Sequence, residues 1–519
     1  MTVLLTSAGV GSRLGSLTKY FNKSMLPVGK LPVISHILNN YSDKTDFIVA
    51  LGHEGKHIRE YINYYHPNLK IKFIQIQNYS GKGSSLHTTL KCCTKFIKSD
   101  FIFHVNDAII KQKIPLNFNK DTLLISKKYS DTGEFRTISI NNKKIIKIND
   151  KNYFSKNENI YSYIGVAYIK DYKLFNNIIE KTNNNFAELN YFKHQFDQNN
   201  LNYLKIDRWH DTGTVKTLNK TISEISNFTN LNKLDEAIYF KSNKVIKFFT
   251  NKNLVKKRVK RSKILNKCVP KIISFSKFFY SYKFVNGKLF SKINPSANEF
   301  EKLMLFFEKN LWKKQTINNK KIFNSYCKNF YHHKTIVRLK KFYKIHKIKD
   351  TQNLINGKNY EKLSKLLRLI NWNKIIDGIP VLFHGDLHFE NIIKTKKGFK
   401  LIDWRDSFDK SINYGDLYYD LSKIYHGLLV NHSIVKKGKF VIQINKSNVK
   451  LKIQLQNGYR DLIDYYNKYL AMNKFSKYKV NIITSLIFLN ISPLHEGKYG
   501  VFLYYLGKKM LGDALNLRK

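Results

Sequence analysis

A loop near the start of the chain combines glycines with an arginine, and this combination suits phosphate binding. It reads SAGVGSRL at residues 7–14, directly after an apolar run. Glycines let the backbone approach phosphates, the amides at a helix start bind anions, and Arg13 adds a forked cation for a triphosphate. The sixth position is Leu14 rather than glycine, which argues against a dinucleotide fingerprint. The nucleotide-binding positions expected in this loop are Ala8, Gly9 and Gly11.

A second group of residues has the spacing needed for phosphoryl transfer to an alcohol. The sequence reads HGDLHFEN at 384–391 and LIDW at 401–404. In this chemistry one aspartate accepts or orients the hydroxyl proton, while a following asparagine and a second aspartate hold Mg²⁺. The two motifs resemble the aminoglycoside phosphotransferase and choline kinase family; protein kinases have His-Arg-Asp and Asp-Phe-Gly at these points. The resemblance implies that Asp386 is the catalytic base and that Asn391 and Asp403 are metal ligands.

The segment after the glycine loop resembles an element of the sugar nucleotidyltransferases, a family that includes the phosphocholine cytidylyltransferases. It reads NKSMLPVGKLP at 22–32, similar to the family's PK-x-x-LPV-x-x-x-P. The resemblance places Lys23 beside the phosphates, where cations must spread the charge that builds up in the transition state. Asp107 follows an apolar run where the family has a metal-binding aspartate, and Asp211 lies in WHDTGT, similar to W-x-D-x-G-T. Both aspartates are expected to hold Mg²⁺ between the α-phosphate and the acceptor phosphate.

Three further positions follow from the same resemblance. Asn78 and Gly83 match positions that read the nucleobase, and Gly165, in YIGVA, matches the acceptor-binding strand. The chain departs from the family at Ser7 in the loop and at Asn106, where glycine is common. These departures leave the base open, so CTP, UTP, dTTP and GTP are all candidates for the nucleotide donor.

The kinase-like resemblance also implies residues outside its main motif. Lys247 lies in VIKF, an expected strand whose lysine would bind the α- and β-phosphates of ATP. Its usual glutamate partner is not evident, since residues 251–270 contain no acid. Asp416, in a Gly-Asp pair, is expected to have a structural role, with acceptor binding as the alternative.

The elements that must position these residues fall into two domains. Short apolar runs alternate with helical patterns over the first 225 residues, which predicts an α/β nucleotidyltransferase domain with a Rossmann-like, mainly parallel sheet at 1–228. Residues 229–519 are expected to form an α+β, protein-kinase-like two-lobed domain. Its small lobe would span about 236–290 and its helical large lobe about 295–519, with β-like runs at 391–394 and 400–402.

The composition limits the classes of partner molecule that the chain is expected to bind. The chain has 91 lysines and arginines against 37 acids, so its formal charge is 91 − 37 = +54. The basic residues are spread along the sequence. This favours an accumulation of lysine at surface positions that tolerate it over a nucleic-acid-binding role. Peripheral contact with an anionic membrane and the oligomeric state are left open. Four cysteines without metal-ligand spacing, together with the lack of a signal-peptide pattern, favour the cytoplasm.

The two motif sets together predict a bifunctional enzyme. The kinase would use ATP to phosphorylate a small alcohol or sugar. The nucleotidyltransferase would then join a second NTP to that phosphate ester and release pyrophosphate. Choline, ethanolamine and a sugar are the candidate acceptors, for a lipid-headgroup or surface-polysaccharide precursor. The alternative is that only one domain is catalytic and the other is a nucleotide-binding or membrane-docking module.

Overall fold

The computed structural model describes residues 1–115, 117–154, 159–182, 188–226, 234–431, 435 and 437–516. This part of the chain forms two compact units. The first holds Met1–Lys252 and Ser274–Ser281, and the second holds Asn253–Ile273 and Tyr282–Lys519. The domain boundary expected at 228/229 lies outside the described residues and stays a prediction.

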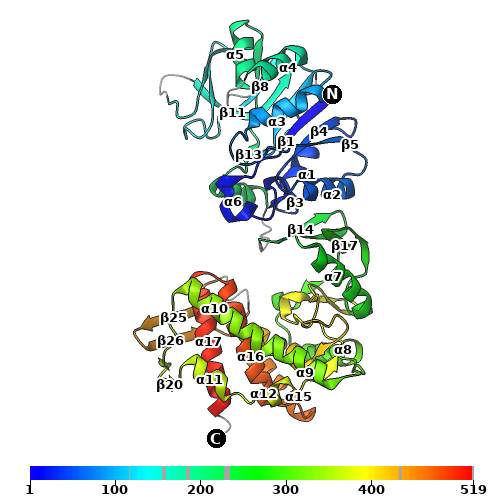
Figure 1. Ribbon diagram of the computed structural model, residues 1–519, viewed down its shortest axis with the longest axis vertical. Helices are drawn as coiled ribbons and strands as arrows, with labels where there is room; N and C mark the ends of the chain where they lie inside the picture. The colour runs from blue at the N-terminus through cyan, green and yellow to red at the C-terminus, as the bar shows by residue number, and fades with distance from the viewer. Residues whose placement is uncertain are drawn as a thin grey trace. The chain divides into compact units, whose positions relative to one another are not determined.

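The first unit is built on a mixed sheet, which has nine strands among the described residues (Figure 1). These are β1 (Thr2–Ser7), β4 (Asp46–Leu51), β5 (Lys70–Gln75), β6 (Phe101–Val105), β8 (Asp121–Ser126), β9 (Thr137–Asn141), β10 (Lys144–Asn149), β11 (Asn159–Ile169) and β12 (Leu201–Lys205). The main path runs β10-β9-β11-β6-β1-β4-β5, and β12 pairs with β8, which pairs with β11. Strands β5, β4, β1 and β6 run parallel, whereas β11 is antiparallel to its neighbours. The expected α/β domain is confirmed, and its parallel strands carry the glycine loop.

Side chains on opposite faces of β1 enter two different hydrophobic cores. Val3 and Leu5 pack on one face, while Leu4 packs on the other. Helices α1 (Val33–Leu38), α2 (Gly55–Tyr65) and α6 (Val215–Ile225) contribute to the first core. Helices α3 (Leu86–Cys93), α4 (Tyr172–Lys181) and α5 (Leu189–Asp197) contribute to the second (Figure 1). Strands covered on both faces read as continuous apolar runs, which is why the parallel strands could be recognised from the sequence.

Two short pairings complete the sheet structure of the first unit. A hairpin joins β2 (Pro27–Val28) to β3 (Leu31–Pro32), and β7 (Ala108–Ile110) pairs antiparallel with β13 (Trp209–Asp211). The second pairing brings together two segments that are about a hundred residues apart in sequence, and both expected metal-binding aspartates lie at the same end of it, because Asp211 pairs with Ala108.

A small antiparallel sheet follows in the order β14-β15-β17-β16. Its strands are β14 (Glu236–Lys241), β15 (Lys244–Phe249), β16 (Ile272–Phe275) and β17 (Phe279–Lys283). Side chains of β14 and β15, among them Tyr239 and Phe248, join the core that contains α2. The Tyr239 hydroxyl donates to the Met25 carbonyl at 2.5 Å. The hairpin of β14 and β15 is therefore part of the first unit.

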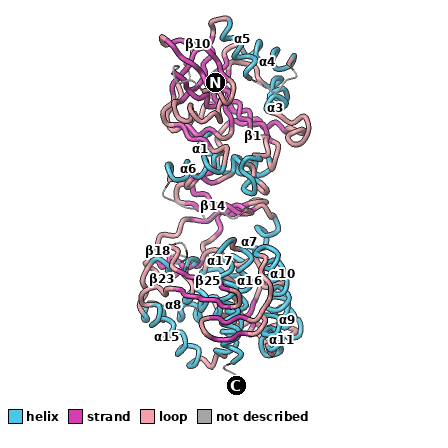
Figure 2. Tube along the Cα trace, turned by 90° about the vertical axis from the view of Figure 1, so that its left-hand side faces the viewer, coloured by secondary structure: helices cyan, strands magenta, loops and turns pink. Residues whose placement is uncertain are grey.

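The second unit is mainly helical. Its helices are α7 (Lys252–Leu265), whose first residue belongs to the first unit, α8 (Ala297–Asn310), α9 (Lys320–Lys328), α10 (Lys334–His346), α11 (Leu363–Leu369), α12 (Trp372–Ile376), α13 (Leu417–Leu429), α15 (Tyr459–Met472), α16 (Lys477–Ile491) and α17 (Gly497–Asn516). Helix α16 packs against α10, α13 and α17, and Figure 2 shows it beside α10 and α17. Because neighbours surround it, α16 is buried along nearly its whole length. None of the described helices has the length and apolar character needed to cross a bilayer.

The second unit also contains strands. The two expected β-like runs form the hairpin of β22 (Ile392–Thr395) and β23 (Gly398–Leu401), and β18 (Lys288–Leu289) pairs with β22. A short pair joins β21 (Pro380–Val381) to β24 (Gly415–Asp416). The sequence analysis did not anticipate a further sheet in the order β20-β19-β26-β25. Its strands are β19 (Asn353–Ile355), β20 (Lys358–Tyr360), β25 (Phe440–Asn445) and β26 (Asn448–Ile453).

Candidate active site

The glycine loop turns sharply between β1 and the 3₁₀ helix η1 (Ser12–Thr18). Gly11 precedes this helix with φ 68° and ψ 40°, a left-handed conformation that glycine adopts without strain. The Thr18 hydroxyl donates to the Gly11 carbonyl at 3.1 Å and ties the loop to the helix. Ala8 is buried, whereas Gly9 and Arg13 are exposed. No atom lies within 4 Å of a Cβ added at Gly9, so the loop has open space there for a ligand.

Lys23 is positioned by its buried neighbour Asn22. The Asn22 amide donates to the Ser7 carbonyl at 2.8 Å and to the His53 carbonyl at 2.9 Å, while its oxygen caps the short helix η2 (Lys23–Met25). Lys23 Nζ then lies 2.7 Å from Asp107 Oδ2. The lysine and the first expected metal-binding aspartate are therefore in direct contact.

Asn106, one of the departures from the family pattern, also has a structural explanation. It is buried, and its amide donates to the Ser24 hydroxyl at 2.8 Å. Ser24 follows Lys23 in η2, so this hydrogen bond joins the segment that carries Asp107 to the segment that carries Lys23. A glycine at 106 could not make it.

The two aspartates are brought together by the pairing of β7 with β13. Asp211 pairs with Ala108 in this ladder, and the Thr212 backbone N–H donates to the Asp107 carbonyl at 2.9 Å. A Cβ built on the buried Gly213 would lie 3.1 Å from Asp107 Oδ2, 3.3 Å from Asp211 Oδ1 and 3.3 Å from Arg13 Nη2. Arg13, Asp107 and Asp211 thus converge on one point.

Two carboxylates lie close together at this point, which suits a divalent cation. Burial favours the neutral form of Asp107, but Lys23 and Arg13 outweigh it and hold the pKa of Asp107 below its usual value. Burial and the neighbouring Asp107 raise the pKa of Asp211 to about 6. Two crowded carboxylates are the kind of oxygen ligands that Mg²⁺ takes together with phosphates and water. The described residues contain no group of three metal-ligating side chains, so phosphates would have to complete the coordination.

Lys151 belongs near this site, although no motif marked it. It follows β10, and burial lowers its pKa, as do Arg13 and Arg136, while Asp107 acts in the opposite direction. Lys151 is therefore a further cation whose charge interacts with those of Arg13 and Asp107. It comes from the antiparallel half of the sheet, at an isolated position that no spacing rule would single out.

The expected nucleobase residues lie next to each other. Gly83 has φ 84°, and a Cβ built on it would lie 3.2 Å from Asn78 Nδ2. The structure therefore brings together two positions five residues apart, on the segment between β5 and α3. Their nucleobase-reading role stays a prediction.

On the expected acceptor-binding strand, the side chain of Val105 lies very close to the backbone of Gly165. This glycine has φ 75°, and an added Cβ would lie 2.6 Å from Val105 Cγ2, so no larger residue fits. Nearby on β11, the buried Tyr163 hydroxyl has no hydrogen-bond partner among the described residues, and neither does Glu188 Oε2. Burial raises the pKa of Glu188. Unpaired buried polar atoms are costly, so these two groups are candidates for contacts with an acceptor.

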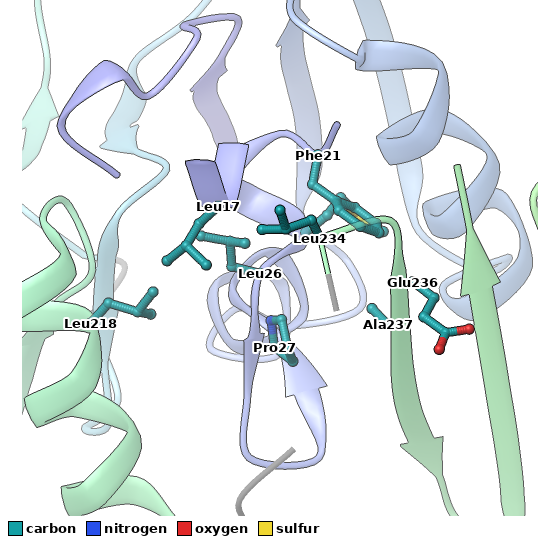
Figure 3. Close-up of a pocket in the computed structure, with 9 residues that line it drawn as sticks. Leu17, Phe21, Leu26, Pro27, Leu218, Leu234, Glu236 and Ala237 are labelled. Atoms are coloured by element: carbon teal, nitrogen blue, oxygen red, sulfur yellow. The ribbon is translucent and has the colours of Figure 1, made fainter. Parts of the chain in front are cut away.

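An apolar pocket in the same unit is not the catalytic site. Figure 3 shows Leu17, Leu26, Phe21 and Leu234 around it. Its cavity volume is about 20 Å³, far below the roughly 300–1,000 Å³ of small-molecule sites, and its one charged lining residue is Glu236. A nucleotide would therefore not bind there.

Comparison with known proteins agrees with this geometry. The sequence profile of the nucleotidyl transferase family matches residues 2–227. The N-terminal domain is a nucleotidyltransferase domain related to the sugar nucleotidyltransferases and cytidylyltransferases. Enzymes of this family use NTP substrates and Mg²⁺, which fits the charged groups at Gly213.

The individual relatives are distant. The bifunctional protein GlmU of Methanococcus maripaludis (strain DSM 14266) is 28% identical over 180 residues, which is 34% of this chain and 41% of that protein. The glucose-1-phosphate cytidylyltransferase of Salmonella typhimurium is 26% identical over 144 residues, covering 23% of this chain and 56% of that protein. The chain thus spans about two fifths of the length of the first of these relatives.

One solved structure similar to the chain is the CTP:phosphocholine cytidylyltransferase LicC of Streptococcus pneumoniae. It is 15% identical, with a TM-score of 0.35, and the match covers 43% of this chain and 99% of that one.

Gly213→Ala is expected to lower nucleotidyl transfer about 10²-fold, because the added methyl would push Arg13 and the two aspartates apart and small displacements of reacting groups are costly. Pyrophosphate release from NTP and a phosphate ester measures the effect. The unfolding temperature serves as the control and should stay close to that of the wild type. An unchanged rate would show that this convergence point is not the reaction centre.

A second group of charged residues surrounds the HGD motif in the second unit. Gly385 has φ 87°, and an added Cβ would lie 2.7 Å from Arg405 Cβ, so only glycine fits. The buried carboxylate of Asp420 accepts from the backbone N–H groups of His384 and Gly385, each at 2.8 Å. These contacts hold the sharp turn that presents Asp386.

His384 supports the same turn as a neutral ring. Burial lowers its pKa to about 3. Its Nδ1 accepts from the Asp386 backbone N–H at 3.2 Å, so Nε2 carries the proton and donates to the Ile402 carbonyl at 3.0 Å. The ring thereby ties the Asp386 segment to the residue before Asp403.

The expected catalytic and metal-binding residues of this motif are close together. Asn391 Nδ2 lies 3.3 Å from Asp386 Oδ2 and donates to the Asp386 carbonyl at 2.9 Å. The Ile402 backbone N–H donates to the Asn391 carbonyl at 2.9 Å, so Asp403 directly follows a residue bonded to Asn391. Asp403 has φ 59°, an unfavourable conformation for a non-glycine residue that is often found at functional sites.

Two cations contact Asp386 that the sequence analysis did not identify. Lys423 Nζ lies 2.7 Å from Asp386 Oδ1, and His388 Nε2 lies 3.5 Å from Asp386 Oδ2. Burial opposes ionisation, but these two cations hold the pKa of Asp386 well below its usual range. Burial lowers the pKa of His388, but Asp386 and Glu390 outweigh it and raise that pKa to about 9. Asp386 is therefore ionised near neutral pH, as a proton acceptor must be.

Asp416 and Lys247, the two other positions predicted from the kinase-like resemblance, lie in different surroundings. Asp416 is fully buried and accepts from the Tyr331 hydroxyl at 2.7 Å and the Ile379 N–H at 2.9 Å. It also caps α13, so its contacts are structural, and acceptor binding stays an untested prediction. Lys247 is buried on β15, in the first unit, whereas Asp386, Asn391 and Asp403 are in the second. Its role in ATP binding also stays a prediction.

Asp420→Asn is expected to destabilise the second unit by about 1–3 kcal/mol, because an amide presents one acceptor where two buried backbone donors need partners. Urea unfolding followed by tryptophan fluorescence would measure this, since Trp312, Trp372 and Trp404 all lie in that unit. Asp461→Asn, at an exposed position on α15, is the matched control and should change stability by less than about 0.5 kcal/mol. Equal midpoints for the two variants would contradict the bracing role of Asp420.

Proposed function

We propose that the chain is a bifunctional enzyme in which the second unit prepares a phosphate ester for the nucleotidyltransferase domain. A non-bridging phosphate oxygen of the ester attacks the α-phosphorus of an NTP, the bond between its α- and β-phosphates breaks, and pyrophosphate leaves. The observation that carries the proposal is the convergence of Arg13, Asp107 and Asp211 beside Gly213, with Lys23 paired to Asp107. Arg13 and Lys23 are placed to spread the negative charge that builds on the phosphates. Mg²⁺, when bound to the two aspartates, would supply a Lewis acid between the reacting phosphates.

The proposed first step is ATP-dependent phosphorylation of a small alcohol or sugar by the second unit. The hydroxyl oxygen attacks the γ-phosphorus, its proton passes to Asp386, and ADP leaves. Support comes from the lowered pKa of Asp386, which keeps its carboxylate ionised near neutral pH, and from the contact of Asn391 with that carboxylate. Asn391 and Asp403 would hold Mg²⁺ on the ATP phosphates.

The two steps would act on one intermediate because they share one chain. A covalent link raises the local concentration of the first product near the second site, although the gain depends on the geometry of the link. The alternative is that one unit has lost its activity and serves as a binding module. The retained Asp386, Asn391 and Asp403 favour two working sites.

The test is a panel of reactions scored by mass. The full chain is incubated with MgATP, each of CTP, UTP, dTTP and GTP in turn, and candidate alcohols including choline, ethanolamine and sugars. The proposal expects a nucleotide-linked product that needs both ATP and the second NTP. If the product forms only from a ready-made phosphate ester, and no alcohol gives it with ATP, the proposed nucleotidyltransferase activity is kept and the proposed kinase activity is rejected.

A further inference from the structure

Four cationic side chains lie near one another, one of them paired with Asp386, and the residues come from three separate segments. Lys334 and Arg338 lie one turn apart on α10, Arg405 follows β23, and Lys423 lies on α13. Residues four apart on a helix share a face, so the two cations of α10 point the same way. Segments from different parts of the sequence therefore place like charges at one location.

Two of these cations contact the same aromatic ring, and a third is paired with Asp386. Lys334 Nζ lies 4.1 Å and Arg405 Cζ 4.9 Å from the centroid of the same ring, Phe330. Lys423 Nζ is in the 2.7 Å ion pair with Asp386. The backbone N–H of Arg405 donates to the carbonyl of His384, within the turn that presents Asp386, at 3.0 Å. The cluster therefore borders the expected catalytic carboxylate directly.

Acids do not balance the cluster. Within the described residues, Lys334, Arg338 and Arg405 form no ion pair, and Asp386 is shared with Lys423 and His388. Two buried acids of the same unit are engaged elsewhere, Asp420 by the backbone of the HGD turn and Asp416 by Tyr331.

The general excess of lysine in this chain does not explain the arrangement. Lysines that accumulate without a function would be added at solvent-exposed positions. Lys423, in contrast, is only 6% exposed, and the other three side chains are partly buried. Partly desolvated cations without counter-charges are costly. Burial and the neighbouring Arg405 and Arg338 lower the pKa of Lys334 well below its usual value, which reflects this cost. An anion bound among the four side chains would offset it.

We propose that Lys334, Arg338, Arg405 and Lys423 bind an anionic group on the alcohol substrate of the second unit, a carboxylate or a phosphate. The bound anion would bring a hydroxyl of the same molecule to Asp386, where the proposed phosphoryl transfer takes place. This inference rests on the proposed kinase function. It narrows the substrate to an anionic alcohol or sugar, because the cluster would repel choline, ethanolamine or an aminoglycoside.

The test compares charged and neutral alcohols on the full chain. ADP release with MgATP is measured for D-glycerate, glycerol 3-phosphate, glycerol and choline, using the wild type, Lys334→Met and Arg338→Met. Methionine keeps an apolar stem but removes the charge. Turnover of an anionic alcohol is expected, with KM for that alcohol raised about tenfold or more in each variant and kcat less affected. The D-glycerate and glycerol 3-phosphate arms decide between carboxylate and phosphate.

The control variant is Lys340→Met, at an exposed position on the same helix, which should leave KM unchanged. Preferred turnover of choline or glycerol would overturn the proposal, and so would variants that raise KM for ATP instead of the alcohol. Titration calorimetry with inorganic phosphate, D-glycerate and glycerol 3-phosphate, without ATP, separates the two hypotheses. Binding that Lys334→Met weakens, without any ADP release, would keep the anion site and reject the kinase. No difference in binding between wild type and both variants would reject the anion site.

Discussion

Lys23→Met is expected to lower the rate of nucleotidyl transfer about 10²–10³-fold, the usual cost of removing one charged group that stabilises a transition state. Lys23 Nζ is 2.7 Å from Asp107 Oδ2, and the charges of both Lys23 and Arg13 act on Asp107, so we expect Lys23 to offset phosphate charge in the transition state. The loss should fall mainly on kcat, because the charge that Lys23 offsets grows during the reaction. Pyrophosphate release from an NTP and a ready-made phosphate ester measures it.

Lys19→Met provides the matched control for this experiment. Lys19 follows η1 and is exposed, and its ammonium group lies 5.1 Å from the ring centroid of its neighbour Tyr20. The same substitution there should leave the rate near that of the wild type. A folded Lys23→Met protein with full activity would mean that Lys23 only neutralises Asp107.

Much of the nucleotidyltransferase site could be predicted because its residues lie in short, ordered motifs. The glycine loop, Lys23 and the two aspartates each follow a strand or a tight turn. Strands and tight turns both have patterns that are easily recognised in a sequence. The glycine loop follows β1 and Asp107 follows its parallel neighbour β6, and the antiparallel pairing of β7 with β13 brings Asp211 beside Asp107. The glycine at 213 has a role that only coordinates reveal, since its lack of a Cβ leaves space among Arg13 and the aspartates.

Residues that reach a site from distant elements could not be predicted in this way. Lys151 approaches the first site from the antiparallel strands, and Lys423 approaches Asp386 from α13, with no local pattern to mark either. The sheet formed by β19, β20, β25 and β26 was missed for a different reason. Only β26 alternates apolar and polar residues, with asparagine and lysine at its exposed positions. β25 begins with three apolar residues in a row, and only Val449 and Leu451 are buried in the two strands.

Asp386→Ala is expected to reduce ATP-dependent phosphorylation about 10²–10⁴-fold, the range for loss of a general base. The same variant should release pyrophosphate at the wild-type rate when a phosphate ester is supplied, because Arg13, Lys23, Asp107 and Asp211 all belong to the first unit. Lys23→Met should show the reverse pattern. ADP formation and pyrophosphate release, measured on the same preparations, give both rates.

Stability needs its own measurement in this experiment. Removing Asp386 leaves Lys423 and His388 without their shared counter-charge, and breaking a buried pair by deleting one partner can cost about 3–5 kcal/mol. Asp386→Asn keeps the shape of the side chain and is the second variant if Asp386→Ala unfolds. Asp461→Asn again serves as the surface control.

Opposite losses in Lys23→Met and in the Asp386 variants would establish two independent sites, because a single shared site would lose both activities with either substitution. If both activities fail together in a folded Asp386 variant, the two-site hypothesis is wrong.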